Sequence, residues 1–175
     1  RLRGVYHALA VEIGERGARD QCARLAGDSK LIGCFYVGCP SWAHAPKWNP
    51  VGPWFDPASL QPQAGRDELA RTAARYYQVA HDAIRRYDPN HLILGDRYEG
   101  SALVPNQVLL AATPYMDVMC FQYFRTTGEI CADFQRWHEL TGKPILLADA
   151  CAPGRRTDTY TTGVATTASG TSGRR

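Results

Sequence analysis

Carboxylate side chains follow two short apolar runs of the sequence, and this is where the chain could do chemistry. Asp96 and Glu99 come after residues 91–95, and Asp149 comes directly after residues 143–148. Two carboxyl groups beside one sugar can cleave a glycosidic bond, because one protonates the leaving oxygen while the other acts as nucleophile or base. These three residues are therefore the candidate catalytic groups.

Aromatic and hydrogen-bonding side chains accompany the carboxylates. Binding sites for small molecules combine apolar and aromatic walls with a few placed polar groups. Aromatic rings can pack on the apolar faces of sugar rings, and Arg, Gln and His side chains can bind hydroxyl groups. The predicted substrate-binding residues are Arg97, Tyr98, Gln122, Tyr123, Trp42, Trp54 and His44.

The sequence lacks the motifs of several other kinds of active site. No predicted strand is followed by Gly-x-Gly-x-x-Gly, by a phosphate-binding Gly-Lys-Ser/Thr loop or by Gly-x-Ser-x-Gly, so the nucleotide and serine-hydrolase patterns are missing. The six cysteines show no Cys-x-x-Cys spacing, which favours reduced, buried thiols over a metal site. The sequence therefore predicts neither a cofactor nor a metal.

Strands and helices are expected to alternate, which indicates an α/β fold with a parallel sheet. In such folds ligands bind beyond the carboxyl ends of the strands. The proline- and tryptophan-rich residues 40–65 are a predicted functional loop. The predicted strands are 31–37, 91–95, 117–121 and 143–148, and the predicted helices are 6–25, a helix capped by Asp67 that runs to residue 88, 105–112, and 130–141 closed by Gly142.

Composition narrows the expected partners. The 175 residues carry a formal net charge of +3, which is too small and scattered for a nucleic-acid-binding surface. No apolar run approaches the roughly 20 residues of a membrane helix. No signal peptide is visible after Arg1, so secreted and cytoplasmic locations stay open, as does the oligomeric state.

Residues 1–151 form the predicted domain, and the Thr- and Gly-rich residues 152–175 are predicted to be disordered.

The segment 76–98 resembles the helix-4-to-strand-5 region of clan-A (β/α)8 glycoside hydrolases, most closely the β-agarase group. It carries His-Asp-Ala-Ile-Arg at 81–85, Asp-Pro-Asn-His-Leu at 88–92 and Leu-Gly at 94–95. Three further segments are similar to strands 4, 6 and 7 of that family, namely 31–36, 116–123 and 142–149. The resemblance implies a partial TIM barrel of about strands 4–7 and a polysaccharide substrate cleaved without a cofactor.

The resemblance also implies roles for the carboxylates. Asp149 stands where the family has its nucleophilic Glu, and Pro40 stands where the family has its acid/base Glu. Glu99 or Asp96 would then supply the acid. Three alternatives stay open: a catalytically inactive carbohydrate-binding relative, a truncated fragment, and a doubly wound binding domain in which Asp149 binds a cation.

Overall fold

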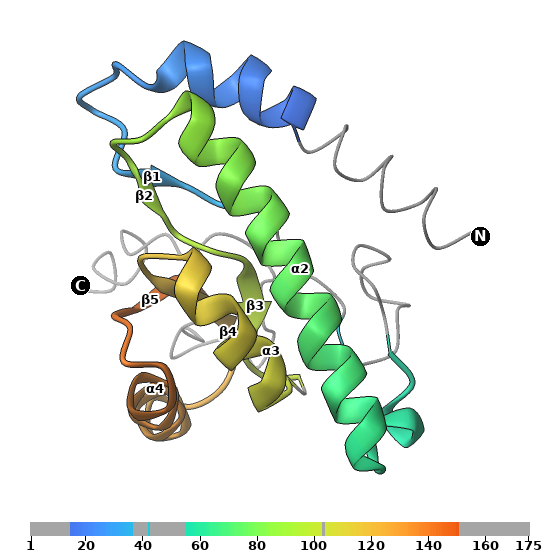
Figure 1. Cartoon of the computed structure of the whole chain (residues 1–175). Helices are drawn as coiled ribbons and strands as arrows, with labels where there is room; N and C mark the ends of the chain where they lie inside the picture. Colours follow the sequence, from blue (N-terminus) through green and yellow to red (C-terminus); the bar gives the residue numbers. More distant parts are fainter. Residues whose placement is uncertain (1–14, 37–41, 43–54, 103, 151–175) are drawn as a thin grey trace, which may run out of the picture.

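The computed structural model describes residues 15–36, 42, 55–102 and 104–150. Helices and short strands alternate along this part of the chain (Figure 1). Residues 15–25 are helical. The elements that follow are β1 (Gly33–Cys34), the 3-10 helix η1 (Pro57–Leu60), α2 (Gln63–Tyr87), β2 (Leu92–Ile93), β3 (Arg97–Glu99), α3 (Asn106–Ala112), the 3-10 helix η2 (Thr113–Tyr115), β4 (Met119–Tyr123), α4 (Thr127–Thr141) and β5 (Ile145–Ala150).

All strand pairs in the described part of the chain are parallel, which confirms the predicted α/β class. β1 pairs with β2, and β3, β4 and β5 form a three-stranded sheet in that order. The connections that contain α2, α3 and α4 return the chain to the amino end of the next strand, as parallel strands require. The carboxyl ends of β3, β4 and β5 therefore lie at the same edge of the sheet.

Gly95 separates β2 from β3, where the sequence predicts one strand over 91–95 with residues 96–99 at its carboxyl end. The structure differs from this prediction because residues 97–99 form a separate strand, β3. Gly95 has φ +71°, a conformation that glycine adopts readily. Residues 94–96 connect the two short strands, with the left-handed Gly95 in the middle position.

Two helices begin earlier than predicted. α2 starts at Gln63 after Pro62, so Asp67 does not cap it; the Asp67 carboxylate instead accepts a hydrogen bond from Gln63. α4 starts at Thr127 because Thr126 and Glu129 form a capping box, in which each side chain bonds the other's backbone N–H. The predicted end of α4 is confirmed, with Gly142 in the left-handed conformation.

The core lies between α2, α3, α4 and one face of the sheet. Figure 1 shows α2 and α3 side by side, and residues of α2 contact residues of α3. The ring of Phe121 on β4 stacks on Trp137 of α4, with centroids 4.0 Å apart and planes 3° apart. No helix within the described ranges combines the length and the apolar content that crossing a membrane requires.

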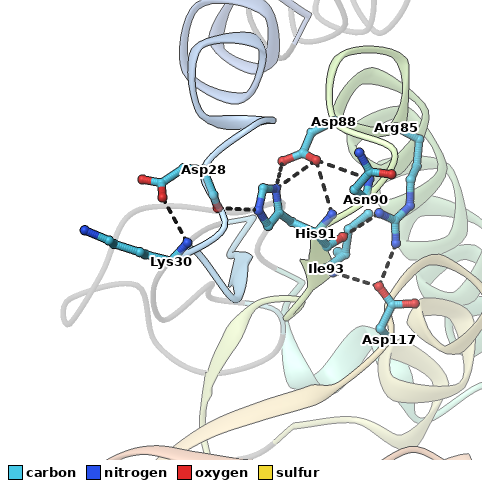
Figure 2. Close-up of polar contacts among 8 residues, drawn as sticks. All are labelled: Asp28, Lys30, Arg85, Asp88, Asn90, His91, Ile93 and Asp117. Carbon is cyan, nitrogen blue, oxygen red and sulfur yellow. Dashed lines mark hydrogen bonds and ion pairs between the residues drawn. The ribbon is translucent and has the colours of Figure 1, made fainter.

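A polar cluster lies at the amino ends of β1, β2 and β4 (Figure 2). We call it the amino-edge cluster, and it consists of Asp28, Arg85, Asp88, His91 and Asp117. Arg85 donates from Nη2 to Oδ2 of Asp117 and from Nη1 to the backbone carbonyl of His91, both at 2.6 Å. Asp117 also accepts the backbone N–H of Ile93 at 2.7 Å. The cluster thus joins the end of α2 to the starts of β2 and β4.

His91 lies between two hydrogen-bond acceptors (Figure 2). Its Nδ1 is 2.8 Å from Oδ2 of Asp88, and its Nε2 is 3.0 Å from the backbone oxygen of Asp28. A carboxylate and a carbonyl can only accept, so the protonated ring satisfies both. The bond to Asp88, and next the bond to Asp28, raise the pKa of His91. Burial would raise the pKa of Asp88, but hydrogen bonds from His91 and Asn90 lower it below its ordinary value.

Candidate functional site

The carboxyl ends of β3, β4 and β5 bring three of the predicted site residues into one row. Glu99 is opposite Gln122 in the parallel pair of β3 and β4, and Gln122 is opposite Asp149 in the pair of β4 and β5. Neighbouring strands lie about 4.8 Å apart, so the Cα atoms of Glu99 and Asp149 are about 10 Å apart across β4. Two carboxyl groups therefore share one edge of the sheet, with an amide side chain between them.

A β-bulge in β5 determines which face of the sheet carries Asp149. Phe121 is opposite Leu147, whereas Gln122 is opposite Asp149, so Ala148 is an extra residue in β5. In a regular register Ala148 would be opposite Gln122, and Asp149 would point to the other face because side chains alternate along a strand. The bulge places Asp149 on the same face as Gln122.

The three strands present two chemically different faces. The helix face carries Tyr98, Phe121 and Tyr123, which are almost fully buried in the core. Side chains alternate along a strand, so the residues between these point the opposite way. We call that opposite side the carboxylate face, and it carries Arg97, Glu99, Gln122 and Asp149.

Polar contacts hold the side chains of the carboxylate face in place. Nη1 of Arg97 is 2.9 Å from Oδ2 of Asp149. Gln122 donates from Nε2 to Oε2 of Glu99 at 2.6 Å, and the backbone N–H of Ser101 donates to Oε1 of Glu99 at 2.9 Å. Glu99 is 4% exposed, while the side chains of Arg97 and Asp149 are 38% and 26% exposed. The ion pair is therefore more open to solvent than Glu99 is.

Asp96 and Tyr98 lie between the sheet and α2, away from the carboxylate face. The buried Asp96 accepts hydrogen bonds from the hydroxyls of Tyr77 at 2.7 Å and Tyr76 at 3.4 Å. The hydroxyls of Tyr77 and Tyr98 are 2.7 Å apart. Burial, and next the nearby charge of Asp96, raise the pKa of all three tyrosines well above the ordinary value. The structure therefore does not bring Asp96 together with the other two candidate carboxylates.

Tyr123 also faces the helices. Its hydroxyl donates to the carboxylate of Asp133 on α4. Burial, and next the bond to Asp133, raise the pKa of Tyr123 to about 12. Burial would raise the pKa of Asp133 too, but hydrogen bonds from Tyr123 and Arg136 lower it. Tyr123 thus follows Gln122 in sequence but lies on the other side of the sheet.

The predicted loop over residues 40–65 is described at residues 42 and 55–65, where part of it is helical in η1 and the start of α2. Trp42, predicted as a stacking platform, is 1% exposed and packs against Tyr76 and Tyr77, with ring centroids 5.6 and 5.8 Å away. Its ring is part of the core. The predicted binding residues Trp54 and His44 lie outside the described residues, as do Pro40 and the tail predicted over 152–175.

Metal binding at this site has little support from its side chains. Within residues 15–36, 42, 55–102 and 104–150, no group of three or more His, Cys, Asp or Glu side chains could hold a metal ion. Asp149 is paired with the guanidinium of Arg97. A cation at Asp149 would have to displace that pairing.

Two features of the site were missed by sequence reasoning. Ser101, whose backbone N–H binds Glu99, follows it by two residues, and this spacing is typical of local side-chain-to-backbone bonds in turns. The spacing could have indicated the contact, although such bonds are commoner for shorter side chains. The bulge at Ala148 carries no sequence signal, because residues 145–150 have the pattern of a regular strand.

Comparisons with known proteins find similarity to solved structures alone. No protein-family model and no curated protein matches the chain. The chain is similar to the solved structure of an exo-β-agarase, with 28% identity, a TM-score of 0.46, and coverage of 52% of this chain and 12% of that one. An agarase named AgWH50C shows 22% identity and a TM-score of 0.44, over 53% of this chain and 13% of that one.

A protein named BpGH50 shows 16% identity and a TM-score of 0.49, over 83% of this chain and 40% of that one. The chain therefore spans less than half of the length of each of these structures. All three TM-scores are below 0.5. An agarase activity of this chain is therefore a proposal.

Proposed function

We propose that this chain is part of a (β/α)8 glycoside hydrolase and that its carboxylate face binds and cleaves an agar-type polysaccharide. One observation carries the proposal: Glu99, Gln122 and Asp149 form one row across the carboxyl ends of three parallel strands. Active sites of barrel enzymes lie at that end of the strands. Most glycoside hydrolases also use a pair of carboxyl groups to cleave the glycosidic bond.

The order of the strands supports a barrel over a doubly wound sheet. The described strands pair in the order in which they occur along the chain. A doubly wound fold binds its ligand where the strand order reverses, and a barrel keeps the sequential order. The segment 76–98, which resembles the helix-4-to-strand-5 region of the family, supports the assignment to about strands 4–7.

Asp149 is the proposed nucleophile or base. Arg97, 2.9 Å away, holds the carboxylate in place and adds a donor for sugar hydroxyls. Since the ion pair is partly exposed, a ligand can approach both groups. Gln122, between the two carboxylates in the row, is proposed to bind a hydroxyl of the sugar that bridges them.

Glu99 is the proposed acid, and Asp96 is the weaker candidate because tyrosine hydroxyls from α2 surround it. Each oxygen of Glu99 accepts one hydrogen bond, from Gln122 or from Ser101. A carboxyl oxygen has a second lone pair that can carry a proton. A protonated Glu99 can therefore keep both contacts and still donate to a leaving oxygen.

A non-catalytic carbohydrate-binding protein is the second candidate. Two observations favour it: Glu99 is only 4% exposed, and Asp149 is tied to Arg97. Both restrict the freedom that acid–base chemistry needs. In that case the carboxylate face would bind the sugar through hydrogen bonds and release it unchanged.

The two candidates differ in turnover. The full chain is incubated with agarose oligosaccharides, release of reducing ends is measured, and binding is measured by calorimetry. For a hydrolase we expect Asp149→Asn and Glu99→Gln each to lower release by about 100-fold or more, with binding retained. Binding without any release by the unaltered chain would establish the second candidate.

Asp67→Asn is the matched control, because Asp67 is an exposed carboxylate on α2 that bonds only a neighbouring glutamine in the described structure. It should leave both release and binding unchanged. Unchanged release by Asp149→Asn would remove Asp149 from the mechanism.

A further inference from the structure

A cleft of about 510 Å³ opens beside the same carboxyl ends, on the helix side of the sheet. It lies between the segments that follow β3 and β4 and the helices α2, α3 and α4. We call it the arginine cleft, and the residues that define it are Arg66, Ser101, Arg125, Asp133, Arg136 and Trp137. Its volume is within the range of small-molecule binding sites.

The charge of the cleft is mainly positive. Arg66 donates to the backbone oxygens of Leu60 and Gln61 and to the side chain of Gln63, which are neutral acceptors. Arg125 donates to the backbone oxygen of Ser101 at 3.1 Å and is 3.4 Å from a Glu129 oxygen, outside the cleft lining. Three guanidinium groups therefore line the cleft.

Asp133 is the carboxylate of the lining, and each of its oxygens already accepts a hydrogen bond from a neighbouring side chain. Its two oxygens accept hydrogen bonds from Tyr123 and from Arg136, the latter at 2.8 Å. The cleft thus has a surplus of donors and of positive charge. A group that carries several acceptor oxygens and a negative charge would match this surplus.

Trp137 lies at the boundary between the cleft and the core. It lines the cleft and is 2% exposed, and its indole Nε1 is buried without a hydrogen-bond partner among the described residues. A buried donor without a partner costs roughly 1–3 kcal/mol. This N–H is closed to solvent, so the exposed guanidinium groups of Arg125 and Arg136 are the donors that a ligand in the cleft can reach.

The cleft is connected to the proposed catalytic row through Ser101. The backbone N–H of Ser101 binds Glu99, and its backbone oxygen accepts from Arg125. A sugar chain that crosses the edge of the sheet can therefore contact both sides. Resting on the proposed function, we infer that the arginine cleft binds an anionic substituent of the polysaccharide, a sulfate ester or a carboxylate, and so selects charged over neutral chains.

Calorimetric titration of the full chain tests this inference. The probes are neutral agarose oligosaccharides, the same oligosaccharides with sulfate esters, and a uronate-containing oligosaccharide of equal length. We expect one charged probe to bind at least about tenfold more tightly than the neutral one, and the probe that does so identifies sulfate or carboxylate. Arg125→Gln and Arg136→Gln should each reduce this preference several-fold, because one charge-assisted hydrogen bond is lost.

Arg71→Gln is the matched control, because Arg71 is an exposed arginine of α2 paired with Glu68 and lies outside the cleft lining. It should leave the preference unchanged. Equal binding of all probes, or a preference that survives both cleft variants, overturns the inference and leaves the proposed function standing. Binding of none of the probes overturns the proposed function itself.

Discussion

The two ends of the parallel strands carry charged groups of the same types but use them differently. In the amino-edge cluster, Asp88 is 1% exposed and both ring nitrogens of His91 have acceptors. On the carboxylate face, Arg97 and Asp149 are partly exposed, and Nε of Arg97 is buried without a partner among the described residues. At the amino ends the hydrogen-bonding groups already have protein partners, whereas at the carboxyl ends some of these groups are left for a ligand.

This difference teaches how stability and function divide along the strands. A fully satisfied polar network rigidifies the structure around it. In barrel folds the amino ends of the strands serve stability, whereas the carboxyl ends hold the active site. Changes at the amino edge should therefore lower the free energy of unfolding, and changes at the carboxyl edge should affect ligand binding first.

The largest effect is expected for Asp88→Ala in the amino-edge cluster. The change removes the acceptor of His91 and of two backbone N–H groups, and bonds to charged groups contribute about 1.5–3 kcal/mol. We expect the free energy of unfolding to fall by about 3 kcal/mol in urea denaturation. Asp82→Ala, at an exposed carboxylate of α2, should change it by less than about 0.5 kcal/mol. If both variants lost the same free energy of unfolding, the amino-edge cluster would not be a special contributor to stability.

Gly95→Ala tests the turn that joins β2 to β3. A Cβ at this position would be 2.6 Å from Sδ of Met116, and the backbone φ of +71° disfavours any side chain. We expect a loss of about 2 kcal/mol in the same measurement. Gly142→Ala is the control, because φ is +67° there and no atom lies within 4 Å of the added Cβ. Gly142→Ala should lower the free energy of unfolding by only about 1 kcal/mol. An equal loss in the two variants would show that the contact of the added Cβ with Met116 contributes nothing.

Arg97→Gln should separate function from stability at the carboxyl edge. The ion pair with Asp149 is partly exposed, so its contribution to stability is below about 1 kcal/mol. Binding of the agarose oligosaccharides should nevertheless weaken by about tenfold, since a charged hydrogen-bond donor is lost. Calorimetry and urea denaturation of the same variant measure the two effects. A large loss of stability with unchanged binding would contradict the division between the two ends.

The smallest effect is the pH dependence of the amino-edge cluster. The pKa of His91 is raised in the folded chain, so its stabilising contribution is present below its ordinary value of about 6.5 and is lost as pH rises through the folded value. The wild-type chain and His91→Gln should differ in unfolding free energy at about pH 5.5 and converge at about pH 8.5. A difference that grows with pH would show that the neutral ring is the stabilising form.

Asp88 acts in the opposite direction at lower pH. Its pKa is lowered in the folded chain, so its contribution is present above its ordinary value of about 3.9 and is lost as pH falls through the folded value. The window of greatest stability for this pair therefore lies between the two ordinary values.

Much of the order of elements could be predicted from local pattern. The sequence predicts the apolar run of β4, the helix after Pro105 and the Gly142 terminus of α4, because periodicity and capping are properties of neighbouring residues. The start of α2 was misplaced, since Asp67 is a good capping residue by type and the helix had already begun after Pro62. Residue type alone cannot rank two possible starts.

The candidate site shows the same limit. Glu99, Gln122 and Asp149 were identified from their positions after apolar runs, and the strand register places them in one row. Asp96 and Tyr98 have equally suitable side chains and adjacent positions, yet they face α2. The turn at Gly95 and the alternation along β3 separate them, and a list of residues after a strand does not contain that information.

The amino-acid order is sufficient for the parallel α/β class, for most helix ends and for the residue types available at the carboxyl edge, because these depend on short-range pattern. The face on which Asp149 lies depends on the bulge at Ala148. The pairing with Arg97 and the saturation of the amino-edge cluster depend on segments far apart in the chain. Such contacts form only when the strands pair and the helices pack, so the tertiary structure is their physical cause.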